Sequence, residues 1–168
     1  MTTNPADLPD DTRHRAVRDL EEAFSELMGE FRRVYAQAAA TAAPGMLPGT
    51  FKTLAVVSRQ GPITQSCLVE RLAADKGLIS RQVSELEGLG MIARTADPAD
   101  GRVRLIEITE HGRERLATAL EPYQSMLLGA LHGWPLPSIE RLTTLIHALA
   151  SGIVPHADDV FEATEPES

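Results

Sequence analysis

Three short helical segments followed at once by two short stretches typical of strands are the feature that most constrains this chain. Thr50, Thr64 and Asp75 each stand where a side-chain oxygen can cap the start of a helix, and Gly90 can end the last one. Inward-facing apolar side chains recur at helical spacings within the segments. The predicted helices run from about Thr50 to Arg59, from Gln65 to Ala74 and from Lys76 to about Leu89.

The stretches after the third helix predict a β-hairpin. Met91–Thr95 is one expected strand, and Val103–Ile108, in which apolar and charged residues alternate, is the other. The turn-rich segment Asp97–Arg102 lies between them. Helix, helix, tight turn, helix and hairpin is the order of a winged helix-turn-helix. In that fold the second helix of the pair can lie in a DNA major groove while the first braces it across the backbone.

Long amphipathic helices are predicted on both sides of this region. Residues 11–40 carry one apolar stripe, and a helix of that length with such a stripe needs a partner helix. A second long helix is expected after an N-cap at Thr109, with a kink at Pro122, and a last helix after an N-cap at Ser138. The stripes are Leu20, Phe24, Leu27, Phe31 and Val34, and then Leu116, Leu120, Tyr123, Leu127 and Leu131.

The net charge of −8 is unusual for a nucleic-acid-binding protein, but the charge is unevenly distributed. Between Arg59 and Arg104 the chain carries seven basic and six acidic residues. The acidity therefore lies outside the predicted winged helix-turn-helix. The overall acidity also keeps a second class open, a winged helix that binds a protein partner rather than DNA.

The sequence lacks the signatures of several other classes of protein. Cys67 is the only cysteine, which excludes an internal disulfide and a thiolate-rich zinc site. The five histidines show no pair at the spacing that places two ligands on one helical face, so no metal site is predicted. The chain shows no glycine-rich phosphate loop and no nucleophile elbow, so we expect no enzyme, no catalytic residue and no cofactor. Without a signal peptide or an apolar run long enough for a membrane span, a cytoplasmic protein is expected.

The outward face of the third short helix suits contact with base edges. With its apolar residues inward, this helix shows small or cationic residues and no acid before Glu85. Arginine can bond guanine in a bidentate manner, serine can serve several bases, and leucine can touch a thymine methyl group. A solvated helix face fits the same pattern. The candidate residues are Lys76, Gly77, Leu78, Ser80, Arg81 and Ser84.

The predicted hairpin tip adds two arginines, Arg102 and Arg104, beside a glycine-containing turn. An exposed arginine there suits the negative potential of a narrow minor groove. Asp100 can hold Arg102 by a charge-assisted hydrogen bond. An ordinary polar β-turn fits the same residues.

Taken together, these residues resemble the MarR (multiple-antibiotic-resistance regulator) family over about residues 50–115. The combination is specific, whereas no single piece of it is. The flanking helices agree by position and pattern only. The matching features are Asp75-Lys76, Ile79-Ser80-Arg81, Leu86-Glu87, Gly90-Met91-Ile92, Arg94, the Asp97-Pro98-x-Asp100-x-Arg102 wing and Thr109-x-x-Gly112.

The resemblance implies a transcription regulator, expected to be a repressor, that acts as a homodimer on a pseudo-palindromic operator in double-stranded DNA. It implies that Ser80, Arg81 and Ser84 read bases. Arg102, braced by Asp100, enters the minor groove, and Arg94 and Thr64 meet the phosphate backbone. The chain departs from the family where Gly101 replaces a common second arginine and where Gly77-Leu78 replace small hydroxyl residues.

The expected fold class is mainly α with a small β-hairpin, a winged helix-turn-helix flanked by N- and C-terminal dimerisation helices. The expected parts are a flexible tail (1–10), an N-terminal dimerisation helix (11–45), the winged helix-turn-helix (46–108), C-terminal dimerisation helices (109–154) and an acidic disordered tail (155–168).

Two regulatory expectations also come from the resemblance. Many relatives release DNA when a small amphipathic or phenolic molecule binds. Here such an effector site would lie near Phe31, Tyr35, Phe51 and His111, although ordinary core packing explains the same residues. Redox-sensing relatives carry their cysteine in the first helix, so Cys67 is expected to be a buried structural thiol.

Overall fold

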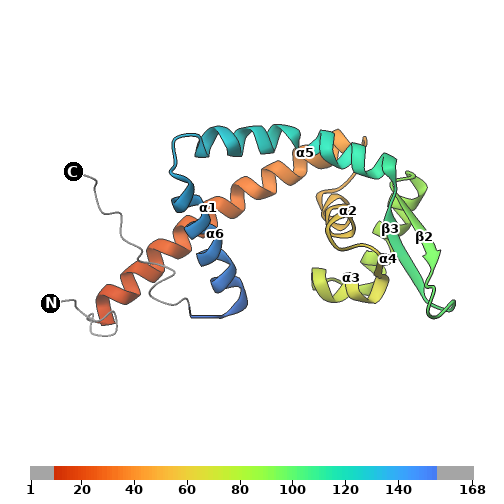
Figure 1. Ribbon diagram of the computed structural model, residues 1–168, viewed down its shortest axis with the longest axis horizontal. Helices are drawn as coiled ribbons and strands as arrows, with labels where there is room; N and C mark the ends of the chain where they lie inside the picture. Colours follow the sequence, from red (N-terminus) through yellow and green to blue (C-terminus); the bar gives the residue numbers. More distant parts are fainter. Residues whose placement is uncertain (1–9, 155–168) are drawn as a thin grey trace. The chain divides into compact units, whose positions relative to one another are not determined.

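The computed structural model describes residues 10–154, which form six helices and three short strands (Figure 1). The predicted mainly helical fold with a small sheet is confirmed, and the helix boundaries lie within three residues of those expected. The elements are α1 (Asp10–Ala42), α2 (Pro48–Gln60), β1 (Ile63–Thr64), α3 (Gln65–Leu72), α4 (Lys76–Gly88), β2 (Ile92–Ala96), β3 (Arg104–Ile108), α5 (Glu110–Leu131) and α6 (Leu136–Ser151). The predicted tails lie outside the described residues, except that Asp10 already belongs to α1.

The chain divides into two compact units, of which the first ends at Glu121 and the second begins at Pro122. The first unit contains α1 to α4, the sheet and the first half of α5. In it the short helices and the hairpin gather at the C-terminal end of α1 (Figure 1). Helix α5 continues through Pro122, so the proline does not end the helix.

The sheet is antiparallel, with strand order β1–β3–β2. The expected hairpin is present: Arg94 of β2 pairs with Ile106 of β3, and the strands lie within a residue of their predicted positions. Strand β1 adds a third member, because Ile63 pairs with Ile106 from the other side. The sequence did not predict β1, since two residues are too few to show alternation. This strand ties the start of α3 to the hairpin.

The core of the first unit is built mainly from aliphatic side chains, as the low aromatic content requires. Phe51 and Leu54 of α2 and Leu68 of α3 are fully buried. Opposite them, the inward face of α4 contributes Ile79, Val83 and Leu86, as predicted. Burial of these side chains fixes which face of α4 is left for solvent.

Three of the predicted N-terminal helix caps are confirmed. Thr64 accepts a hydrogen bond from the Cys67 amide at 3.2 Å, and Asp75 accepts one from the Leu78 amide at 3.0 Å. Thr109 accepts one from the Gly112 amide at 3.0 Å. Each bond satisfies one of the amides that the first turn of a helix leaves without a partner.

Gly90 ends α4 in the expected left-handed conformation, with φ +69°. Its amide donates to the carbonyl of Glu87 at 2.9 Å, and the next amide, of Met91, donates to the carbonyl of Leu86 at 2.9 Å. This pair of bonds is a Schellman motif, which glycine favours because it has no Cβ to strain.

Two predicted caps are wrong. Helix α2 begins at Pro48, after Leu47, so Thr50 lies inside the first turn with its hydroxyl buried against Glu85. Helix α6 likewise begins at Leu136, and Ser138 lies in its first turn. In both cases a proline near the start supplies the required φ and lacks the amide that a cap would satisfy, so the helix starts three residues earlier than the predicted cap implies.

The second unit contains the rest of α5 and α6. None of the residues of α6 is buried within the chain, although its sequence is strongly apolar. Leu128 and Leu149 are 72% and 56% exposed. Exposed apolar surface of this extent is typical of faces that contact another protein. Within residues 10–154 no helix combines the length and the apolar character that a membrane crossing needs.

Candidate nucleic-acid interface

Helix α4 has one face in the core and the opposite face open to solvent. Val83 and Leu86 are fully buried, whereas Leu78 is 41% exposed. A side chain that is free of the core can reach a ligand without unfolding any part of the protein. Of the predicted base-contacting residues, Lys76, Gly77, Leu78, Arg81 and Ser84 are exposed and Ser80 is half-buried.

The start of α4 is held by a tight turn. Helix α3 ends at Leu72, and the next residue, Ala73, takes a left-handed conformation with φ +46°. Two residues later Asp75 caps α4, and a Cβ at Gly77 would lie 3.0 Å from its Oδ1 atom. The glycine that departs from the family pattern therefore leaves room for the cap. The capped turn determines where the exposed residues of the first turn begin.

Thr64 is held from two sides. Its backbone belongs to β1, where it pairs with Leu105 of β3, and its hydroxyl oxygen caps α3. A capping hydroxyl accepts through its oxygen and keeps its own proton free to donate. Thr64 thus retains the donor that a phosphate contact requires.

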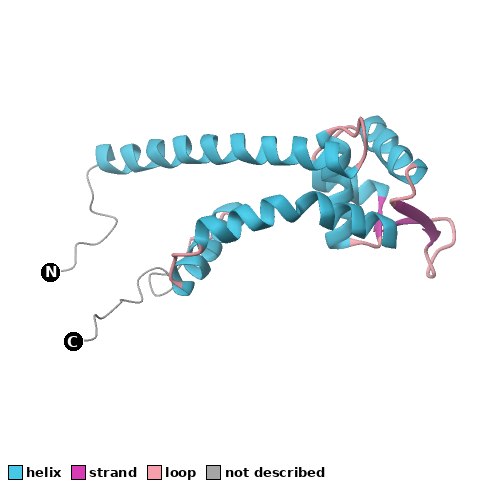
Figure 2. Cartoon of the chain, turned by 90° about the horizontal axis from the view of Figure 1, so that it is seen from above, coloured by secondary structure: helices cyan, strands magenta, loops and turns pink. Residues whose placement is uncertain are grey.

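The hairpin tip is an internally bonded turn that projects from the sheet (Figure 2). The Asp97 amide donates to the Val103 carbonyl at 3.0 Å, and the Val103 amide donates to the Asp100 carbonyl at 2.9 Å. The Asp100 carboxylate accepts from the backbone amide of Arg102 at 3.0 Å. We expected this carboxylate to hold the arginine side chain. It orders the turn through the backbone instead, and it leaves the guanidinium of Arg102 exposed.

Arg94 has a partner within the chain. Its Nη1 atom donates to Oε2 of Glu87, near the end of α4, at 2.6 Å. The register pairs Ala96 with Arg104, so Arg94 and Arg104 point to the same face of the hairpin. The ion pair links the sheet to α4, and a phosphate would have to compete with Glu87 for Arg94.

A polar contact between α2 and α4 was not anticipated. Thr53 is fully buried and donates to Oε1 of Gln82, itself 8% exposed, at 2.8 Å. One turn further along α4, Thr50 donates to Oε2 of Glu85 at 3.0 Å. A signal was present in the sequence, because Gln82 stands three residues after Ile79 and four before Leu86, on the inward face.

The predicted effector residues are only partly brought together. Phe31 and Tyr35 of α1 line a groove of about 630 Å³ in the first unit, and Phe51 lies beneath Tyr35 with the ring centroids 5.7 Å apart in an edge-to-face arrangement. Phe51 itself is fully buried. The groove is lined by Met28, Phe31, Arg32, Tyr35, Pro48, Gly49 and Lys52.

His111 does not belong to this groove and is exposed in the first turn of α5. The reason is that the start of α5 packs on the hairpin: the Thr109 amide donates to the Met91 carbonyl at 3.0 Å. The prediction that grouped His111 with the two aromatic residues of α1 is therefore wrong.

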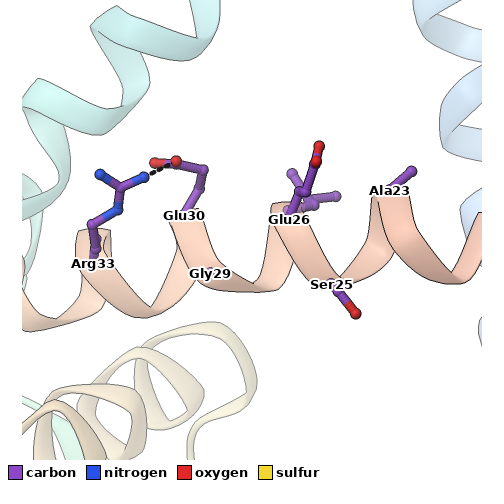
Figure 3. A pocket seen from close by; sticks show the side chains of 7 residues that line it. Ala23, Ser25, Glu26, Gly29, Glu30 and Arg33 are labelled. Carbon is purple, nitrogen blue, oxygen red and sulfur yellow. Dashed lines mark hydrogen bonds and ion pairs between the residues drawn. The ribbon is translucent and has the colours of Figure 1, made fainter.

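A second hollow, of about 650 Å³, runs along α1 alone (Figure 3). Its residues lie between Ala23 and Arg33, and the side chains of Glu30 and Arg33 point toward each other and form an ion pair. A hollow on a single helix has no opposing wall that could enclose a ligand.

Cys67 is exposed rather than buried, which corrects the expectation. Its neighbour Leu68 takes the inward position on α3 and is fully buried. Among the described residues, His, Cys, Asp and Glu side chains form no cluster of three that could hold a metal ion.

One family model matches part of the chain. Residues 48–103 match the model of the MarR family. The uncharacterized HTH-type transcriptional regulator YdgJ of Bacillus subtilis is 30% identical over 78 residues, which are 46% of this chain and 48% of YdgJ. The chain thus spans about half the length of the curated relatives that it matches first.

Two solved structures show the same fold. FabT of Streptococcus pneumoniae, in complex with DNA, has a TM-score of 0.66 at 16% identity, over 81% of this chain and 96% of FabT. CouR of Rhodococcus jostii, bound to p-coumaroyl-CoA, has a TM-score of 0.65 at 22% identity, over 82% of this chain and 96% of CouR.

Proposed function

We propose, from the match of residues 48–103 to the MarR family model, that the chain is a winged helix-turn-helix transcription regulator of that family. In this proposal it binds a pseudo-palindromic operator as a homodimer and represses transcription. The observation that carries the proposal is the division of α4 into a buried apolar face and an exposed face that bears Lys76, Arg81 and Ser84. A helix with cationic and hydroxyl side chains on its free face is suited to a major groove.

The wing supplies a second contact. Arg102 projects from a turn that its own backbone bonds make rigid. The ordered backbone at such a tip loses little conformational entropy when the guanidinium enters a narrow minor groove, where the potential is most negative. Thr64 and Arg94 add phosphate contacts that position the protein without reading sequence.

Exposed apolar residues support the homodimer. On α1, Val17 and Leu20 are each about half exposed, and in the second unit Leu128 and Leu149 are more exposed still. A second copy of the chain would cover such stripes, and a two-fold symmetric dimer would present two copies of α4 to two operator half-sites. The FabT complex with DNA is a solved example of the fold on DNA.

The groove on α1 and α2 is the proposed effector site. Its apolar wall contains Phe31 and Tyr35, and Arg32 and Lys52 supply positive charge. This lining suits an amphipathic aromatic molecule, and CouR is a relative in fold that holds p-coumaroyl-CoA. We propose that such a ligand releases the protein from its operator. A regulator of this kind acts in the cytoplasm, where its operator lies.

Fluorescence anisotropy of a labelled duplex from the region upstream of the gene tests the DNA-binding proposal. We expect saturable binding that weakens steeply as salt rises, because each phosphate contact releases counterions. Arg102→Ala should lower the affinity. Arg33→Ala on α1 is the matched control, since it removes an exposed arginine far from α4 along the chain, and it should leave the affinity unchanged.

The alternative, a winged helix that binds a protein, predicts a different result. Neither upstream nor genomic fragments would then bind above non-specific levels, and Arg102→Ala would have no effect on DNA. A protein contact with an apolar centre would also depend on salt much less.

A further inference from the structure

Helix α2 takes part in both the groove and the support of α4. Its first turn, with Pro48, Gly49 and Lys52, lines the groove. Residues within and just beyond that turn donate hydrogen bonds to α4. Nearly every residue from Thr50 to Val57 is buried. Because a close-packed interior transmits displacement rather than absorbing it, this helix cannot move at one end and stay in place at the other.

Gly49 is the residue that the two regions share. It lines the groove, and a Cβ at this position would lie 2.8 Å from the Nε2 atom of Gln82. The side-chain amide of Gln82 therefore packs directly on the backbone of Gly49. Only a residue without a Cβ permits this approach without a shift of the glutamine.

Thr53 completes the cluster. Its hydroxyl has a single proton and two acceptors within reach, Oε1 of Gln82 at 2.8 Å and the carbonyl oxygen of Gly49 at 3.2 Å. Its side chain thus touches both the groove wall and α4. Since the cluster is buried, losing one of these bonds is costly, and the bonds fix the relative direction of the two helices.

We propose that Gly49, Thr53 and Gln82 form a junction through which the state of the groove sets the position of α4. The proposal rests on the DNA-binding function proposed above and adds the route of its regulation. A ligand that displaces the backbone of Gly49 moves Gln82, whose neighbours Arg81 and Ser84 lie on the exposed face of α4. Thr53 and Gln82 are positioning residues and do not touch DNA.

A double-mutant cycle on DNA affinity tests the contact. Gly49→Ala should weaken binding about fivefold to tenfold, because its methyl group displaces the glutamine. In a Gln82→Ala background the same change should have almost no further effect, since the obstructed side chain is gone. Gly88→Ala is the matched control on α4, where a Cβ meets nothing within 4 Å.

A comparison of DNA affinity with stability separates positioning from a merely structural role. Thr53→Val with Gln82→Leu replaces both polar partners by apolar groups and should leave urea unfolding nearly unchanged. The same variant should bind operator at least fivefold more weakly, and Thr53→Ser alone, which keeps the hydroxyl, should bind as the wild type does.

The groove is tested by filling it from α1. Met28→Trp should weaken operator binding about threefold or more, and the loss should shrink by at least half in the Thr53→Val background. Equal losses in both backgrounds, no loss in either, or an additive Gly49–Gln82 cycle would overturn the junction while leaving DNA binding intact. A wild type that does not bind DNA would overturn the proposed function, and the junction with it.

Discussion

The guanidinium of Arg115, on α5, donates from Nε to the carbonyl oxygen of Ala42, the last residue of α1, at 2.7 Å. A second nitrogen of the same group donates to the carbonyl of Thr41 at 2.7 Å. The last carbonyls of a helix have no partner within the helix and carry its partial negative charge. Arg115 therefore joins the long first helix to α5 across 73 residues of sequence.

We expect Arg115→Met to destabilise the protein by about 1–3 kcal/mol, because it leaves two carbonyls at the end of α1 without their donor. Urea unfolding at a fixed protein concentration measures the loss. Arg113→Met is the control, since that exposed arginine only pairs with Glu110 one turn away, and it should cost well under about 1 kcal/mol. Equal effects would mean that the contact with α1 contributes nothing specific.

Gly112→Ala should be among the most damaging single methyl additions in the chain. A Cβ at this position would lie 2.1 Å from the carbonyl oxygen of Met91, which is backbone and cannot step aside. The start of α5 would have to move off the hairpin, at a cost of about 2–4 kcal/mol. Thermal unfolding measures it. A stability close to that of the wild type would show that the first turn of α5 does not pack against Met91 as described.

Asp100→Ala should loosen the wing without removing any base-contacting side chain. The variant loses the bond to the Arg102 amide, so the turn samples more conformations and the arginine loses its preset position. We expect operator affinity to fall about threefold to tenfold, with stability almost unchanged. Asp100→Asn, which keeps an acceptor oxygen, should recover most of the affinity. If Asp100→Asn does not recover the affinity for the operator, the carboxylate acts through its negative charge and not through the hydrogen bond.

Glu87→Gln should strengthen DNA binding. It removes the negative charge that pairs with Arg94 at 2.6 Å and frees the guanidinium for a phosphate. The slope of log affinity against log salt should steepen by about one unit at most, which corresponds to one added phosphate contact. In the Arg94→Ala background the same change should bring less gain. An unchanged slope would place Arg94 outside the DNA interface.

Much of the fold could be predicted from local signals. Thr64, Asp75 and Gly90 were correctly identified because caps and left-handed turns depend on residues that are neighbours in sequence. The inward face of α4 followed from periodicity for the same reason. In β3 the alternation did not identify the inward face, because Ile106 and Ile108 are buried and Leu105 is only half-buried. Thr50 and Ser138 are not caps because a nearby proline starts each helix earlier, and the proline is itself a local signal that competes with the cap.

The candidate site was predictable only where one element supplies it. The exposed residues of α4 and the tip of the wing follow from a single helix and a single turn. The partner of Arg94, the position of His111 and the exposure of Cys67 depend on which elements pack together, and periodicity does not report that.

The amino-acid sequence by itself determined the helices, the hairpin and the chemical character of the surface that α4 presents. Only the tertiary structure decided that the Gly49 backbone meets Gln82, that Thr53 bonds across to α4 and that Arg115 closes the end of α1. These contacts join residues 29 to 73 positions apart. They form because the burial of the shared apolar core brings the helices together, and the polar groups that are buried with it must then find partners in place of water.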